Sequence, residues 1–247
     1  MVESYSATLK EIITLSPMTK ALRFQFNKKA EFQPGQFFAW YFTLHEQEGF
    51  SIKHGKQNIQ KRLFSISSTP SEDEVEITVK KTQNPFVSQY LVDFMKVGEE
   101  VKLEGPYGTF IIQPDKDSLF VSAGSGIAPI ISMIRSLQYK KSKVETVLLY
   151  ANKTESEILW RGELEIIAKN NMKHTNHFTL TQDERNSSWQ GSRGRITLDM
   201  IKGAILSKNT NTLQCYICGP LDFIRSIREM LFQIGIPKEH VKVEIYD

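Results

Sequence analysis

The chain has 247 residues, of which 40% are hydrophobic and 24% are charged, and its formal net charge at neutral pH is +3. This length accommodates two domains with separate cores, the composition is typical of a soluble globular protein, and the small net charge argues against nucleic-acid binding. Residues 1–10 lack the apolar core of a secretory signal, and the densest apolar run, Phe37–Phe42, is too short to cross a bilayer. We therefore expect a cytoplasmic protein without membrane insertion.

Up to about Phe110, short β-type segments alternate with turn signals such as Pro34-Gly35. This spacing predicts a small antiparallel β-barrel or sandwich. The polar segment His45–Lys61 is expected to be a mobile surface loop, and Gly105-Pro106-Tyr107-Gly108 a tight turn that joins two domains. The predicted strands are Ser6–Leu15, Ala21–Asn27, Gln36–Leu44, Arg62–Ser67, Val75–Lys80 and Val101–Glu104, with one helix at Val87–Phe94.

Two short patterns in this half are compatible with cofactor binding. Period-2 alternation puts Arg62 and Phe64 on the same side of a strand, and a cation beside an aromatic ring suits a phosphorylated, flat heteroaromatic cofactor. Ser88, near the predicted helix start, can hold a second phosphate together with nearby N–H groups. A solvated arginine with a core phenylalanine, and simple helix capping by the serine, explain the same residues without a ligand.

Beyond Phe110, strands and helices alternate, which predicts an α/β doubly wound parallel sheet. Ligands of such sheets bind beyond the carboxyl ends of the strands, where Gly124, Cys218 and Glu244 are all expected. The predicted strands are 118–123, 144–150, 176–181, 213–218 and 241–246, and the predicted helices are 127–138, about 156–169, 197–206 and 221–234.

The segment Leu119–Ile134 is predicted to form a strand, a glycine turn and a helix, because its isoleucines have helical spacing after the turn. This geometry directs the N–H groups and the dipole of the helix start into Gly124-Ser125-Gly126, where glycines let a phosphate approach. The pyrophosphate of a dinucleotide and an ordinary strand–helix turn both fit. The third glycine of the usual fingerprint is absent, and Pro129 stands near its place.

The two cysteines, Cys215 and Cys218, are too few to ligate an iron–sulfur cluster. They are three apart on a predicted strand and point to opposite faces, so we expect neither a disulfide nor a thioredoxin-like dithiol. In the last strand, alternation places Glu244 and Tyr246 together on one side. The residues expected on the opposite, core-facing side are Val241, Val243 and Ile245.

Several motifs occur in a defined order along the chain. They are Pro34-Gly35-Gln36-Phe37, Arg62-Leu63-Phe64-Ser65, Val87-Ser88-Gln89-Tyr90-Leu91, Gly105-Pro106-Tyr107-Gly108, Gly124-Ser125-Gly126-Ile127-Ala128-Pro129, Cys218-Gly219-Pro220 and Glu244-Ile245-Tyr246. Over nearly the whole chain, this series resembles the ferredoxin–NADP reductase superfamily of flavoenzymes. The resemblance implies an FAD-binding antiparallel β-barrel at residues 1–112 and an NAD(P)H-binding α/β domain at 113–247, with FAD held between them.

By this resemblance, Arg62 would bind a flavin phosphate, Phe64 would pack against the isoalloxazine, and Ser65 would lie near flavin N5. Ser88 would take the second phosphate, which favours FAD over FMN. The residues implied in binding FAD or the nicotinamide coenzyme are Arg62, Leu63, Phe64, Ser65, Lys80, Val87, Ser88, Gly124, Ser125, Gly126, Pro129, Arg195, Gly219, Pro220 and Tyr246.

The resemblance also implies four catalytic residues and no metal site. Ser65, Cys218 and Glu244 would shape the place where nicotinamide C4 meets flavin N5, and Tyr246 would stack on the flavin and give way to nicotinamide. The chain departs from the family in two places: Pro85-Phe86 stands where members often have glycine, and Asp247 follows the aromatic residue that is terminal in plant-type members. Strict alternation also turns Ser65 away from Phe64 unless the strand bends there.

The choice of coenzyme depends on the segment after the third strand of the second domain. NADP-specific relatives often have Ser-Arg where this chain has Thr181-Gln182, followed by Asp183-Glu184, which slightly favours NADH. Arg185, Arg193 and Arg195 are close to this segment in sequence and can serve as the cationic partner of a 2′-phosphate, so NADPH remains an alternative.

The implied activity is that of an FAD-dependent oxidoreductase that takes a hydride from NAD(P)H and passes electrons to an external carrier such as ferredoxin, flavodoxin or an oxygenase component. The alternatives are reduction of free flavin or ferric chelates, and a regulatory or interaction subunit that retains the fold without catalysis. Six further cations have two interpretations: a basic patch that binds an acidic carrier, or ordinary solvated side chains. They are Lys53, His54, Lys56, Lys61, Lys80 and Lys81.

Overall fold

The computed structural model describes residues 3–52, 58–82, 85–183 and 187–246. The chain forms two compact units. The first comprises Met1–Ile111 together with Ile131–Ser136, and the second comprises Ile112–Ile130 and Leu137–Asp247. Because the middle of one helix groups with the first unit, a division of the chain at residue 112 stays a proposal.

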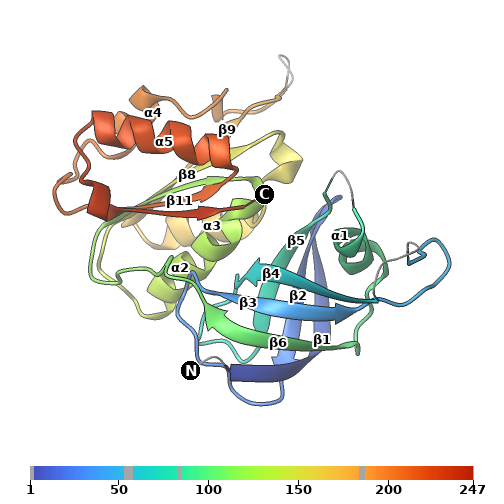
Figure 1. Cartoon of the computed structure of the whole chain (residues 1–247). Coiled ribbons are helices and arrows are strands. Elements are labelled where there is room, and N and C mark those ends of the chain that lie inside the picture. Colours follow the sequence, from blue (N-terminus) through green and yellow to red (C-terminus); the bar gives the residue numbers. More distant parts are fainter. Residues whose placement is uncertain (1–2, 53–57, 83–84, 184–186, 247) are drawn as a thin grey trace. The chain divides into compact units, whose positions relative to one another are not determined.

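The first unit is built on a six-stranded antiparallel sheet that curls into a half-barrel (Figure 1). The antiparallel β architecture predicted for this half is confirmed in this curled form. The strand order is β4-β3-β6-β1-β2-β5, which leaves β4 at one edge. The strands are β1 (Glu3–Ser16), β2 (Thr19–Phe26), β3 (Phe37–Thr43), β4 (Ile59–Ser65), β5 (Val75–Lys80) and β6 (Glu100–Tyr107).

Aromatic residues at every second position of β3 form the centre of this core. Phe38, Trp40 and Phe42 are fully buried, and the Trp40 ring lies 4.8 Å from that of Phe24 on β2. Alternation puts all three on one face of the strand, and each buried aromatic ring removes a large apolar area from water. Because β4 pairs with β3, the residues of β4 that stand opposite these aromatic residues are turned towards the core.

The predicted helix at Val87–Phe94 is present but is not α-helical throughout. It begins as α1 (Val87–Gln89) and continues as a π-helical segment, Tyr90–Phe94. The Met95 N–H donates to the Tyr90 carbonyl at 2.8 Å, which is the i to i+5 spacing of a π-turn. Such turns are rare and occur mostly at functional sites.

The segment His45–Lys61, predicted to be a mobile surface loop, is a surface loop only in part among the residues that the structure describes there. Phe50 is buried, and its ring lies 5.7 Å from Phe86, 5.2 Å from Tyr90 and 5.4 Å from Phe94. Residues 59–61 belong to β4, and residues 53–57 lie outside the described part. Sequence reasoning gave too little weight to Phe50, because its neighbours in the chain are polar.

The tight turn predicted at Gly105-Pro106-Tyr107-Gly108 is also wrong, because β6 continues through Tyr107. Gly105 has a φ of +146°, and a Cβ there would lie 2.6 Å from the Phe38 ring. The glycine therefore serves close packing inside a strand rather than a reversal of the chain.

The second unit contains a six-stranded parallel sheet of order β10-β9-β8-β7-β11-β12, which confirms the predicted α/β class. The helices α4 and α5 cover one face and α3 the other (Figure 1). The strands are β7 (Ser118–Ala123), β8 (Thr146–Asn152), β9 (His174–Leu180), β10 (Ser192–Arg193), β11 (Gln214–Gly219) and β12 (Val241–Ile245). The helices are α2 (Ile127–Tyr139), α3 (Arg161–Asn170), α4 (Leu198–Ala204) and α5 (Leu221–Gln233).

Two details of this unit differ from the sequence prediction. Helix α3 begins at Arg161 instead of residue 156, because Trp160 before it has a left-handed backbone with φ of +60°. Val243 and Ile245, expected to face the core, are 37% and 52% exposed. Since β12 is the edge strand, its alternate residues are not all covered by helix α5. Within the described residues, no helix is long and apolar enough to cross a membrane.

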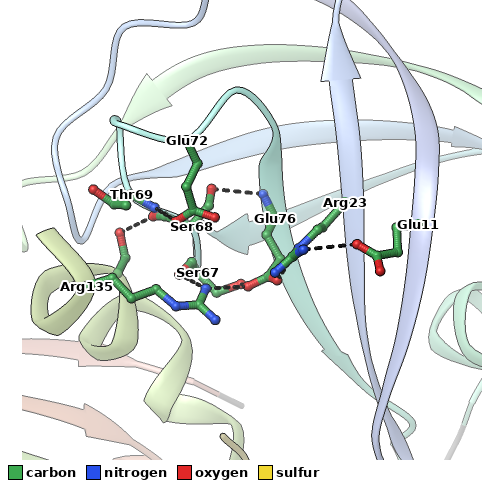
Figure 2. A network of polar contacts seen from close by, with 9 residues as sticks. Glu11, Arg23, Ser67, Ser68, Thr69, Glu72, Glu76 and Arg135 are labelled. Carbon is green, nitrogen blue, oxygen red and sulfur yellow. Dashed lines mark hydrogen bonds and ion pairs between the residues drawn. The ribbon is translucent and has the colours of Figure 1, made fainter. Parts of the chain in front are cut away.

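A buried carboxylate organises a polar network within the first unit (Figure 2). Glu76 on β5 is fully buried, and its Oε1 accepts hydrogen bonds from Arg135 Nη1 at 2.7 Å and from the Ser67 hydroxyl at 2.8 Å. Its Oε2 accepts from Arg23 Nε at 2.9 Å, and Arg23 also pairs with the exposed Glu11. Arg135 belongs to the part of α2 that groups with this unit. The buried charge is thus fully hydrogen-bonded, as its burial requires.

Candidate functional site

Strand β4 carries the motif that was predicted to hold a flavin. Its pairing with β3 is regular from residue 59 to residue 65, with Arg62 opposite Trp40 and Phe64 opposite Phe38. Arg62 and Phe64 therefore lie on the core side, as alternation predicts. Phe64 is half-buried with its ring 6.0 Å from Phe42, while Arg62 is exposed at the edge of the sheet. A phosphate can reach this guanidinium without entering the core.

The other two residues of the motif point the opposite way. Leu63 is exposed and stands opposite Ala39 on the outer face. Ser65 is buried, shares that face and stands opposite Phe37. The described strand has no bulge that would turn Ser65 towards Phe64. The side chains of Ser65 and Phe64 therefore lie on opposite faces of β4, and the two residues are joined only through the backbone of the strand.

The segment predicted for the second phosphate is held by its own side chains. The Ser88 hydroxyl accepts a hydrogen bond from the Thr82 N–H at 3.2 Å, and the preceding residue, Val87, is buried. The residue at the helix cap is Phe86, with no side-chain capping bond, so the capping interpretation of Ser88 is wrong. Lys80 is half-buried at the end of β5, just before this segment.

In the second unit, four polar side chains form a row across neighbouring strands. Tyr150 of β8 is in register with Ser122 of β7, which is in register with Cys218 of β11, which is in register with Glu244 of β12. Residues in register on parallel strands point to the same face. The sequence predicted Cys218 and Glu244 at this sheet edge, but it missed Ser122 and Tyr150, since only strand pairing reveals the row.

Cys218 in this row is a neutral thiol. It is fully buried, and burial together with the nearby Glu244 carboxylate raises its pKa well above the ordinary range. Both cysteines are free, and burial raises the pKa of Cys215 to about 12. Neither can act as a thiolate nucleophile near neutral pH. Cys218 can therefore shape a site and offer a weak S–H donor, without covalent chemistry.

The predicted glycine turn leads directly into α2, and its two glycines have different physical reasons. Gly124 has a φ of +54°, and a Cβ there would meet nothing within 4 Å, so open space lies beside it. A Cβ on Gly126 would lie 2.5 Å from the Cys218 carbonyl oxygen. Pro129 lies in the first turn of α2, where its missing N–H costs no hydrogen bond. The open cradle at Gly124 suits the approach of a phosphate.

The chain around β11 and β12 closes this edge. The Tyr246 N–H donates to the Gly219 carbonyl at 3.0 Å, which holds the residue after β12 beside the end of β11. A Cβ on Gly219 would lie 2.9 Å from the Phe223 ring, and Pro220 is the N-cap of α5. Gly219, Pro220 and Tyr246 are thus brought together with Cys218 at one corner of the sheet.

Ion pairs are found both in the segment that follows β9 and at the start of α3. Arg193 Nε donates to Asp183 Oδ2 at 2.7 Å, and the Ser187 hydroxyl donates to the same oxygen at 2.6 Å. Arg161 pairs with Glu155 and Glu165. A pocket lies here beyond the strands; it is lined by Glu155, Arg161, Gln182, Asp183 and Ser187, among others. Arg195 is exposed nearby in sequence, and Arg185 lies outside the described residues.

No cluster of three or more histidine, cysteine or carboxylate side chains in the described ranges is arranged to hold a metal ion. The residues present do fit the two cofactors that the sequence implies. The first unit offers an exposed guanidinium beside an aromatic ring on a sheet edge, and the second offers an open glycine cradle at a helix start. These are the elements that a dinucleotide needs.

Comparison with known proteins agrees with this arrangement. Residues 6–112 match the oxidoreductase FAD-binding domain, and residues 120–229 match the oxidoreductase NAD-binding domain. The chain is 28% identical over 251 residues to the ferredoxin reductase component of 3-ketosteroid-9-alpha-monooxygenase from Rhodococcus rhodochrous, covering 100% of this chain and 65% of that protein. It is 27% identical over 254 residues to ferredoxin–NADP reductase B from Sorangium cellulosum, covering 99% and 98%.

Several curated relatives are longer proteins, and the chain spans only 52% to 65% of the length of four of them, two flavohemoproteins included. Among solved structures, the FAD/NAD-binding domain of nitric oxide dioxygenase from Vibrio cholerae superimposes with a TM-score of 0.83 at 22% identity, covering 98% of each chain. That likeness shows the fold. With an FAD-binding unit followed by an NAD-binding unit, the chain belongs to the ferredoxin–NADP reductase superfamily.

Proposed function

We propose that this protein is an FAD-dependent oxidoreductase that takes a hydride from NAD(P)H and passes electrons to an external carrier. The observation that carries the proposal is the in-register pair Cys218–Glu244, directly beside the open glycine turn at the carboxyl edge of a parallel sheet. A turn that holds the pyrophosphate would place the nicotinamide end of the coenzyme within reach of this pair. The family membership of both units supports the same conclusion.

Bound FAD would supply the hydride acceptance and the onward transfer of electrons, one at a time or as a pair. The side chains would bind and orient. Arg62 would neutralise a flavin phosphate, Phe64 would cover the ring, and Ser65 would lie near N5. Cys218, Glu244 and Tyr246 would shape the nicotinamide pocket and exclude water from it. Rate would come mainly from holding the two reacting rings at near-attack distance.

The first experiment is an anaerobic titration of the FAD-loaded protein with NADH and with NADPH, followed at the flavin absorbance. Rapid bleaching is the expected result. A protein that binds FAD firmly but is bleached by neither coenzyme would contradict the proposed activity and favour a non-catalytic subunit. FAD that is lost on gel filtration, with turnover restored by added flavin, would instead favour a free-flavin reductase.

For the coenzyme, we propose a preference for NADH. The Arg193 guanidinium is already paired with the Asp183 carboxylate, and Arg161 is paired with two glutamates. A 2′-phosphate would have to displace these carboxylates, whereas a ribose hydroxyl can donate to Asp183. The same titration checks this, since NADPH bleaching the flavin at lower concentration than NADH would contradict the preference.

For the carrier, we propose a ferredoxin, a flavodoxin or an oxygenase component in the cytoplasm. The chain holds too few cysteines for an iron–sulfur cluster of its own, so electrons need an acceptor outside it. Two relatives support the proposal through their names, one a ferredoxin reductase component of a monooxygenase and one a ferredoxin–NADP reductase. Stopped-flow oxidation of the reduced protein by each class of carrier tests it.

A further inference from the structure

Tyr150, which sequence reasoning missed, stands at the end of the polar row and contacts the glycine turn. It is fully buried, and its hydroxyl donates a hydrogen bond to the Gly124 carbonyl at 2.8 Å. Burial raises the pKa of this phenol, so the hydroxyl is protonated at neutral pH and can donate. The contact lies within the second unit and is made by β8, a central strand of its sheet.

The Gly124 carbonyl is held by two donors at once. Besides the Tyr150 hydroxyl, it accepts a hydrogen bond from the Ile127 N–H at the start of α2. A carbonyl oxygen has two lone pairs, so both are used. Because the peptide bond is planar and trans, the Ser125 N–H points in the direction opposite to this carbonyl. Fixing the carbonyl therefore fixes where the Ser125 N–H donor points.

The other end of the turn is fixed by packing. Gly126 lies against the end of β11, where a Cβ would come within 2.5 Å of the Cys218 carbonyl oxygen and 3.0 Å of the Gly219 nitrogen. Gly124 itself has a left-handed φ and open space beside it. A glycine with this freedom would otherwise sample several conformations. The hydrogen bond from Tyr150 restrains the backbone at Gly124, which has no side chain that could limit its conformation.

We propose that Tyr150 is a positioning residue for the coenzyme pyrophosphate: it holds the Gly124–Ser125 peptide so that the Ser125 N–H is aimed at the phosphate. This rests on the proposed function of the glycine turn and adds a residue that does not itself touch the coenzyme. Its contribution appears in coenzyme affinity, since the turn is ordered before the ligand arrives. The rate of hydride transfer from bound coenzyme does not depend on it.

The test compares Tyr150→Phe with the wild-type protein in the FAD-loaded form. ADP-ribose serves as the probe, because it carries the pyrophosphate but has no nicotinamide, and its affinity is measured by calorimetry. Loss of one buried hydrogen bond is expected to weaken ADP-ribose binding about three- to tenfold. The concentration of NADH that half-saturates flavin reduction rises by the same factor, while the bleaching rate at saturation is unchanged.

Tyr216→Phe is the matched control. Tyr216 is also fully buried in this sheet, and its hydroxyl accepts a hydrogen bond from the Gln113 N–H at 2.8 Å, away from the turn. Both variants are measured at a temperature where circular dichroism shows them folded, so that a general loss of stability affects both alike. Y150F that binds ADP-ribose as tightly as wild type, or no more weakly than Y216F, overturns the proposal. Wild-type protein that does not bind ADP-ribose overturns the proposed function instead.

Discussion

At the scale of single residues, Gly124 and Gly126 show that two glycines of one turn can be needed for unrelated reasons. Gly124 is needed for its backbone conformation, and Gly126 for the space that it leaves to β11. A sequence motif records only that both are glycine. An added methyl group would therefore meet open space at Gly124 but would clash with β11 at Gly126.

We expect Gly126→Ala to be the more damaging substitution for the fold. Its methyl group would meet backbone atoms of β11, so the turn must shift and the free energy of unfolding should fall by about 1–3 kcal/mol or more. Gly124→Ala meets no protein atom and costs the fold about 1 kcal/mol through its positive φ. Because its methyl group enters the space proposed for the phosphate, it should nevertheless weaken ADP-ribose binding. Gly203→Ala in α4 is the control, since nothing lies within 4 Å of its Cβ. Equal losses of unfolding free energy in G124A and G126A would contradict this difference.

His174 gives a second residue-scale prediction, on pH dependence. Burial lowers its pKa to about 4, and its ring nitrogens contact Thr146 Oγ1 and Asn176 Oδ1, each at 2.8 Å. The unfolded chain binds the proton first as the pH falls, because its histidine pKa is near 6.5. The stabilisation is therefore complete above pH 6.5 and is lost as the pH falls to about 4, roughly 3 kcal/mol in all.

Urea unfolding between pH 7 and pH 4 checks this sign. His174→Gln removes the titration, so its free energy of unfolding should fall less steeply than that of wild type over this range. Carboxylates contribute to both proteins and cancel in the difference. Parallel curves for the two proteins would show that His174 does not titrate as its burial predicts.

At the scale of elements, strand β5 depends on the charge of Glu76. This carboxylate is fully buried between Arg135, which is nearly buried, and Arg23, which is about one third exposed (Figure 2). Buried ion pairs contribute little compared with apolar residues of the same size, but removing one partner leaves an unpaired charge. The arrangement therefore makes the first unit sensitive to single changes and tolerant of paired ones.

We expect Arg135→Met to lower the free energy of unfolding of the first unit by about 3–5 kcal/mol, because it leaves Glu76 short of a partner. The double variant Glu76→Gln with Arg135→Met should lose clearly less than the sum of the two single losses. Removing the exposed Lys28–Glu3 pair should have no measurable effect. Additive losses in the double-mutant cycle would mean that the two side chains do not interact energetically.

At the scale of the whole molecule, the identity of the carrier depends on surface charge. Of the six cations considered for an acidic partner, three lie among residues 53–57, outside the described part. Lys81 is paired with Asp93 at 2.8 Å, and Lys61 lies over the Tyr41 ring. Lys61 is exposed on β4 and is therefore the described cation with which the patch can be tested.

If this surface binds an acidic carrier, turnover with ferredoxin should fall steeply as salt concentration rises, because screening removes long-range attraction. Turnover with a small neutral acceptor in the same buffers is the control and should stay constant. Lys61→Gln should reduce the salt dependence with ferredoxin. Salt-independent turnover with ferredoxin would rule out the basic patch.

The order of the two units, their classes and the strand–turn–helix at Gly124 follow from the sequence alone, because hydrophobic periodicity and turn residues act over a few neighbours. Only the tertiary structure brought Tyr150, Ser122, Cys218 and Glu244 into one row, since the register of parallel strands depends on hydrogen bonds between distant segments. The burial of Phe50 and the exposure of Ile245 were decided in the same way. Whether a residue is covered depends on which element packs over it, and local sequence does not contain that information.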